Sequence, residues 1–186
     1  MKKNLHIFLC VCAIPFLAAS SALGGAIEGR EYEIKAAYIY NFAKFVEWPG
    51  ASERARSTFS IGILGDDPFG PAIDNAVIDK TVGGRRIIVE RFPDVDAMRR
   101  SAHPIDIVFI GALPAGVLEA ALEYIGNLPI LTIGETPGFC AKGGVITLVI
   151  RKNRVRLEIN RAAAEHAKLR ISSKLLQLAS GPGGKE

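Results

Sequence analysis

IDIVFIG (residues 105–111) is an apolar run, broken only by Asp106, between Pro104 and a closing glycine, and it decides the fold class. A strand whose successive side chains are nearly all apolar is covered on both faces, as strands of parallel sheets are. Similar short runs, rich in β-branched residues, occur on either side of it: FSIGILG (59–65), RRIIVERF (85–92) and LPILTIG (128–134). The sequence therefore predicts a mostly parallel sheet in an α/β protein.

Short helical segments separate these runs. One helix is expected to begin at Pro68, with Asp66 or Asp67 as its N-cap. Two more are expected over DVDAMRRSA (94–102) and PAGVLEAALEYIG (114–126), the latter with proline at its start and glycine at its end. Because parallel strands need crossover connections, these helices should cover both faces of the sheet.

The pattern changes at VITLVIRKNRVRLEIN (145–160), where two alternating runs flank Lys152-Asn153 and predict an antiparallel β-hairpin. Its second strand has an apolar face and a polar one: Val155, Leu157 and Ile159 against Arg154, Arg156 and Glu158. Two amphipathic segments follow, RAAAEHAKL and RISSKLLQLA, the second with Ile171, Leu175 and Leu178 at helical spacing. We therefore expect one α/β domain over residues 27–180, with this hairpin near its C-terminus, and a flexible tail over 181–186.

Residues 1–26 have the order of a secretory signal peptide: two lysines, an apolar run from Leu5 to Ala19, then small residues. That run of 15 residues is shorter than the roughly 20 that a membrane-spanning helix needs. We expect cleavage between Ala22 and Ala26 and a mature protein in the periplasm.

Charge and cysteine content narrow the function classes further. Cleavage removes Lys2 and Lys3 and no acidic residue, which lowers the formal net charge from +4 to +2. So small an excess gives no argument for nucleic acid as a partner. Cys140 is the only cysteine that remains, so an internal disulfide is excluded, whereas an intermolecular one, and with it a homodimer, stays open. The simpler interpretation is a buried thiol that packs as a small apolar side chain.

No pattern in the sequence indicates a catalytic, cofactor or metal site. His103, His166 and Cys140 lack the spacing of metal ligands, and no GxSxG motif or activating base is visible, so a hydrolase or transferase is disfavoured. LGDDPFG (64–70) joins a strand to a helix N-terminus, where ligands bind in open α/β sheets. Its two aspartates would repel a phosphate, and helix capping explains them.

KAAYIYNFAKFVEWP (35–49) predicts a helix that packs against the sheet. Its apolar arc is wide: Tyr32, Ile34, Tyr38, Ile39, Phe42, Ala43, Phe45 and Val46. The narrower polar arc holds mixed charges, whereas a helix that lies on lipid has a strongly basic polar face. Tyr40, Lys44 and Trp48 are expected to remain exposed and available to a partner.

Three further residues are candidates for partner binding. Phe139 lies in the glycine-rich loop GETPGFCAKGG (134–144), where it either docks to a partner or folds into the core. Arg170 and Lys174 belong to the last amphipathic segment. Interfaces favour aromatic and arginine side chains, and the candidate set is therefore Tyr40, Lys44, Trp48, Phe139, Arg170 and Lys174.

Seven motifs resemble, in order, those of the YfiR family of exported bacterial proteins, over nearly all of residues 31–179. They are KAAYIYNFAKFVEWP, FSIGILGDDPFG, TVGGRRIIVERF, PILTIGETPGF, GGVITLVI, NRVRLEIN and LRISSKLLQLA. The resemblance implies a periplasmic α/β domain without known catalysis. It also implies binding to the periplasmic part of an inner-membrane diguanylate cyclase, whose inhibition lowers cyclic di-GMP and biofilm formation.

The family further implies an outer-membrane lipoprotein as a second partner, which sequesters the inhibitor. Members with several cysteines are tied to redox state by disulfides, but Cys140 alone cannot support such control. A different function class stays open beside the regulator: a periplasmic sensor module for another membrane signalling protein, which binds a small molecule in a cleft near Asp66 and Asp67.

Overall fold

The structure, a computed structural model, describes residues 19–50, 56–152 and 154–179, with side chains from residue 29 onward. Most of the expected signal peptide and the whole of the expected tail therefore lie outside the described residues. The predicted cleavage region falls in the first turns of helix α1 (Ala19–Phe45). No helix in the described part of the chain is both long and apolar enough to cross a membrane.

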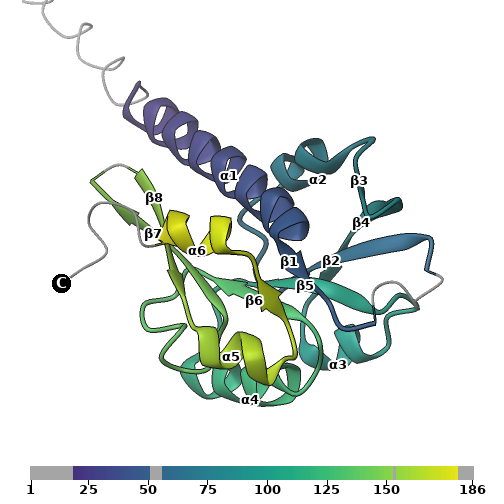
Figure 1. Cartoon of the computed structure of the whole chain (residues 1–186). Coiled ribbons are helices and arrows are strands. Elements are labelled where there is room, and N and C mark those ends of the chain that lie inside the picture. The colour runs from purple at the N-terminus through teal and green to yellow at the C-terminus, as the bar shows by residue number, and fades with distance from the viewer. Residues whose placement is uncertain (1–18, 51–55, 153, 180–186) are drawn as a thin grey trace, which may run out of the picture.

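Seven strands form one curled sheet in the order β3-β4-β2-β5-β6-β7-β8 (Figure 1). The pairs from β4 to β7 are parallel, and one antiparallel strand closes each edge. These strands are β2 (Thr58–Leu64), β3 (Thr81–Val82), β4 (Arg85–Phe92), β5 (Ile105–Ile110), β6 (Leu131–Gly134), β7 (Ile146–Arg151) and β8 (Arg154–Ile159). The predicted parallel sheet and C-terminal hairpin are confirmed. A separate small sheet pairs β1 (Val46–Glu47) with β9 (Arg170–Ile171).

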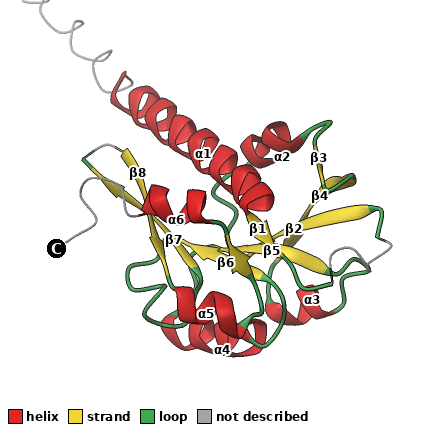
Figure 2. Ribbon diagram, in the orientation of Figure 1, coloured by secondary structure: helices red, strands yellow, loops and turns green. Residues whose placement is uncertain are grey.

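Helices cover both faces of the sheet (Figure 2). Residues of α1, α2, α5 and α6 share one apolar core with the sheet, whereas residues of α3 and α4 share a second core on its other face. The five helices after α1 are α2 (Pro71–Val77), α3 (Val95–Arg99), α4 (Ala115–Gly126), α5 (Arg161–His166) and α6 (Ser173–Ala179). The alternation of strands and helices seen in the sequence thus corresponds to crossovers in a single domain.

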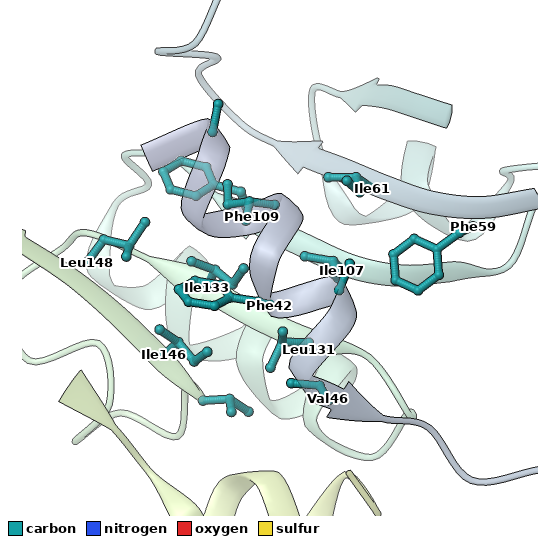
Figure 3. Close-up of a cluster of buried hydrophobic side chains, with 14 of the residues drawn as sticks. Phe42, Val46, Phe59, Ile61, Ile107, Phe109, Leu131, Ile133, Ile146 and Leu148 are labelled. Atoms are coloured by element: carbon teal, nitrogen blue, oxygen red, sulfur yellow. The ribbon is translucent and has the colours of Figure 1, made fainter. Parts of the chain in front are cut away.

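Helix α1 is part of the core, as its apolar arc predicted. Phe42 is fully buried and points onto the sheet among Leu131 and Ile133 (Figure 3). Burial of one such ring stabilises the fold by about 1.5–3 kcal/mol. The predicted arc is wrong for Ile34, which is 47% exposed.

Helix α2 begins at Pro71 and not at Pro68, and no aspartate caps it. Its N-cap is Gly70, which has no side chain that could accept a hydrogen bond from the first turn. The carboxylate of Asp67 is engaged elsewhere: it accepts from the Phe69 amide at 2.8 Å and from Arg91 Nε at 2.7 Å. The residues that were predicted to cap the helix therefore form a turn instead, and the helix begins three residues later than predicted.

The last amphipathic segment is only partly helical. Ile171 lies in β9 opposite Val46, and the Ser172 amide donates to the Phe45 carbonyl at 2.9 Å. Because these main-chain groups are bound to the end of α1, the helix starts at residue 173. Within the helix Leu175 is buried, but Leu178 is 54% exposed. Ile171 belongs to a strand and not to the helix, so the predicted helical spacing of the apolar residues is wrong at both ends of this segment.

Candidate functional site

Tyr40 and Lys44 on α1, Arg170 on β9 and Lys174 on α6 retain solvent access. Tyr40 is half-buried, and Lys44, Arg170 and Lys174 are exposed. The pairing of β1 with β9 places Arg170 opposite Glu47, two residues after α1 ends, and its Nε lies 3.8 Å from the glutamate Oε2. Residues that are 126 positions apart in the sequence, Lys44 and Arg170, therefore belong to neighbouring elements. We call the set Tyr40, Lys44, Arg170 and Lys174 the α1-end surface.

Tyr40 is flanked by two ammonium groups. Lys44 Nζ lies 4.8 Å from the centroid of its ring, and Lys80 Nζ lies 4.5 Å from it while donating to the Ala76 carbonyl at 2.7 Å. Lys80 follows α2, and no sequence signal connected it with α1. An aromatic ring bordered by cations suits an acidic or aromatic group on a partner.

Trp48, expected to be exposed, is buried at 6% exposure. Its Nε1 donates to the Asp106 carbonyl at 3.1 Å, and its ring stands edge-on to Phe59 at 5.2 Å. A buried indole whose only polar atom is bound inside the protein has nothing left to offer a partner. The expectation for Trp48 is wrong because β1 turns it inward, beneath β2 and β5.

Phe139 follows the second of its two alternatives and folds into the core, where it is fully buried. A Cβ added at Gly134 would lie 2.5 Å from its ring, and one added at Gly144 would lie 2.1 Å from it. The ring therefore fills a slot that exists only because both flanking residues are glycine. Phe139 stabilises the loop and is not a docking side chain.

A groove of about 770 Å³ runs between α1 and α2. Aromatic side chains of both segments line it, Tyr32 and Tyr40 from α1 and Phe69 before α2, together with Asn41, Asn75 and Lys80. Tyr40 thus belongs both to the groove and to the α1-end surface. The groove lies next to the predicted cleft, since Pro68 and Phe69 in its wall follow Asp67 directly.

The crevice in which open α/β sheets usually hold ligands is closed here. That crevice lies between β2 and β5, where the crossover connections leave in opposite directions. The Gly111 amide donates to the Leu64 carbonyl at 2.9 Å, and a Cβ at Gly111 would meet the Asp66 carbonyl oxygen at 2.2 Å. The Asp66 backbone is therefore packed directly against Gly111 at the ends of these two strands.

Two buried charges are neutralised inside the protein. Lys35, 3% exposed, pairs with Glu31 and Glu135, and Asp106, 1% exposed in its side chain, pairs with Arg56 and Arg85 at 3.1 Å each. Charges that are paired in this way hold elements together, and they were not singled out in the sequence. Among the described residues, no group of three or more histidine, cysteine or acidic side chains is placed to hold a metal ion.

Comparison with protein families gives one result for almost the whole domain. Residues 32–180 match the family model described as YfiR/HmsC-like. The matched range includes the buried part of α1, the seven-stranded sheet and α6. No curated protein matches the chain.

Proposed function

The chain belongs to the YfiR/HmsC-like family, and we propose from this membership that it is a periplasmic regulator of cyclic di-GMP signalling. The family is regulatory rather than catalytic. In our proposal the protein binds the periplasmic part of an inner-membrane diguanylate cyclase and holds it inactive, which lowers cyclic di-GMP and biofilm formation. An outer-membrane lipoprotein that sequestered the regulator would then restore cyclase activity.

A regulator that inhibits by contact catalyses no reaction, but it has to bind the inactive state of the cyclase more tightly than the active state. A bound protein shifts an enzyme between two states only as far as it prefers one of them. To convert a mostly active cyclase into a mostly inactive one, the preference has to approach about 10⁴-fold. A rigid surface supports such discrimination, and the α1 residues of the α1-end surface, Tyr40 and Lys44, lie on a helix whose opposite side is buried through Phe42.

We assign the contact to the α1-end surface. Arg170 and the cation-flanked Tyr40 are of the residue types that interfaces favour, and Lys44 and Lys174 add positive charge around them. Lys44, Arg170 and Lys174 do not line the groove between α1 and α2, so they are available to a protein partner outside it. The closed crevice between β2 and β5 removes the usual nucleotide site of such sheets, which agrees with a protein that regulates the cyclase without binding its product.

The decisive experiment is deletion of the gene, followed by measurement of cellular cyclic di-GMP and surface attachment. Both should rise, and re-expression of the exported protein should reverse both. Re-expression of a form without residues 1–26 should not, because it stays in the cytoplasm. Unchanged cyclic di-GMP after deletion would sink the regulator proposal.

The groove between α1 and α2 favours a second candidate function, a sensor module that binds a small molecule. About 770 Å³ lined by three aromatic side chains is in the size range of ligand sites. A ligand there should raise the melting temperature of the protein, and Tyr32→Ala should abolish that rise. This sensor function is compatible with the regulator, because Tyr40 borders both sites.

A further inference from the structure

Positive charge is concentrated near the end of the chain. Residues 145–179 contain eight of the 23 lysines and arginines and only two of the 19 acidic residues. The basic residues are Arg151, Lys152, Arg154, Arg156, Arg161, Lys168, Arg170 and Lys174, and the acidic ones are Glu158 and Glu165. The small net charge of the whole chain therefore conceals a strongly basic segment.

The register of the β7–β8 hairpin gathers four of these cations at its turn. Arg151 lies directly opposite Arg154, and Arg156 lies opposite Val149, all on one face because side chains alternate along a strand. Lys152 occupies the turn between the strands with a φ of 52°. The other face carries Ile146, Leu148, Val155 and Leu157, which pack into the core shared with α1.

Glu158 is the one carboxylate on this face, and it is already engaged, since Arg151 Nη2 lies 2.9 Å from its Oε1. Among the described residues, no acidic side chain pairs with Lys152, Arg154 or Arg156. Like charges directly opposite each other on paired strands destabilise the pairing. The hairpin therefore holds an excess of positive charge that weakens the fold and that an anionic partner would relieve.

We propose that this cationic hairpin face, formed by Arg151, Lys152, Arg154 and Arg156, binds an acidic segment of a protein partner. The guanidinium groups of Arg154 and Arg156 alternate with the period of a strand and present planar forks that match carboxylates. An extended segment with acidic residues at alternate positions places its carboxylates on both forks. This inference rests on the proposed function only for the identity of the partner, which would be the cyclase or the lipoprotein.

An anionic membrane is the alternative partner for a basic surface. The positions of the exposed apolar side chains in the hairpin disfavour it. Stable attachment to a bilayer takes apolar insertion in addition to basic residues. Among the hairpin residues that the structure describes, Ile150, 44% exposed, is the only large apolar side chain that is strongly exposed. It lies opposite Val155, on the face away from the arginines. The cations and the apolar side chain therefore cannot meet the same flat surface.

The test is an NMR titration of the purified, ¹⁵N-labelled protein with a short peptide of alternating glutamate and serine. The same peptide with glutamine in place of glutamate is the control ligand, and phosphatidylglycerol vesicles form a separate arm. We expect the glutamate peptide to shift the signals of residues 151–156 most strongly and the glutamine peptide to leave them in place. The double variant Arg154→Gln/Arg156→Gln should bind the glutamate peptide about tenfold more weakly. Arg100→Gln, an exposed arginine on the α3 side, should bind it normally.

Thermal melts of the same variants separate binding from folding. Arg154→Gln removes a like-charge neighbour of Arg151, so its melting temperature should equal or exceed that of the unaltered protein. Absence of shifts at 151–156, shifts of equal size over every basic surface, or binding to vesicles alone would each overturn the inference. Peptide binding at the hairpin together with unchanged cyclic di-GMP after gene deletion would leave this site standing and remove the cyclase role.

Discussion

Lys35 on α1 and Glu135, directly after β6, form an ion pair of 2.5 Å in which only 3% of the lysine side chain is exposed. Glu31 contacts the same Nζ at 2.5 Å, and the Tyr32 hydroxyl donates to the other carboxylate oxygen of Glu135 at 3.0 Å. A buried ammonium is unfavourable unless it is paired. Helix α1 is thus held to the sheet by a charge network around Lys35 and by the apolar side chains of Ala36, Ile39, Phe42 and Ala43, which lie nearer its C-terminus.

Removal of the carboxylates should harm the fold more than removal of the lysine. Glu31→Gln/Glu135→Gln leaves a buried charge without a counter-charge and should lower the free energy of unfolding by about 3–5 kcal/mol. Lys35→Met removes the buried charge itself, and the two glutamates, 31% and 26% exposed, remain partly hydrated. Urea unfolding of both variants checks the order. A larger loss of unfolding free energy for Lys35→Met than for Glu31→Gln/Glu135→Gln would contradict this order. It would show that the ion pairs stabilise the fold by net attraction and do not merely offset the cost of burying the lysine.

The slot around Phe139 gives a prediction about two glycines. Gly144→Ala puts a Cβ 2.1 Å from the Phe139 ring and should cost about 1–3 kcal/mol through overpacking. Gly116→Ala in the first turn of α4 would place its Cβ more than 4 Å from any atom beyond the adjacent helix backbone and should stabilise the helix by up to about 0.5 kcal/mol. Chemical denaturation measures both. In a Phe139→Ala background the Gly144 substitution should become nearly harmless, and an undiminished cost there would contradict the slot.

The sheet was predictable because strands that are buried on both faces consist almost entirely of apolar residues, and such runs are visible in the sequence. IDIVFIG became β5, in which every residue is buried, and the neighbouring runs became β2, β4 and β6. The inward side of α1 was predictable from its period, since Phe42 and Ile39 are fully buried. These are properties of single segments, which the sequence displays directly.

The environment of the candidate side chains was not predictable, because it depends on segments that are far apart in the chain. Trp48 finds its acceptor 58 residues away at Asp106, and Lys35 finds Glu135 at a separation of 100 residues. The cation beside Tyr40 comes from Lys80, after a different helix. Whether an aromatic residue near a chain turn lies inside or outside the fold is decided by these long-range contacts, which the local sequence does not display.

Cys140 should behave as a protected thiol. It is half-buried, and burial raises the pKa of its thiol, although the Thr147 hydroxyl that donates to Sγ at 3.0 Å opposes part of that rise. Because the thiolate is the reactive form, alkylation at neutral pH should be slower than that of free cysteine. Cys140→Ser should leave the protein equally stable with and without reductant. A reductant-sensitive dimer on a non-reducing gel would instead make Cys140 an intermolecular link.

The raised pKa also predicts a dependence of stability on pH. The folded state holds the thiol proton more tightly than the unfolded state does. Its contribution to stability is therefore fully present below the unfolded pKa of about 8.5 and declines as the pH rises above that value. The unfolding free energy of the unaltered protein, taken relative to that of Cys140→Ser, should therefore fall across that range in urea titrations. A constant difference would contradict the effect of burial.

The α1-end surface, through which we propose that the cyclase is held inactive, should be sensitive to charge reversal. Lys44→Glu and Arg170→Glu should each raise cyclic di-GMP and surface attachment toward the levels of the deletion. Lys44→Glu removes the contact of the lysine with the Tyr40 ring and places a negative charge in the last turn of α1, so it should cost about 1 kcal/mol of stability. Arg170→Glu places a second glutamate opposite Glu47, but the two side chains are 86% and 75% exposed, so its cost should stay below about 0.5 kcal/mol. Arg100→Glu, on the side of the sheet covered by α3, is the matched control and should repress normally.

Melting temperatures, periplasmic abundance and cyclic di-GMP are measured together for the three variants. If Lys44→Glu and Arg170→Glu repress as well as Arg100→Glu does, the regulator contacts its partner elsewhere, and the cationic hairpin face becomes the next surface to alter.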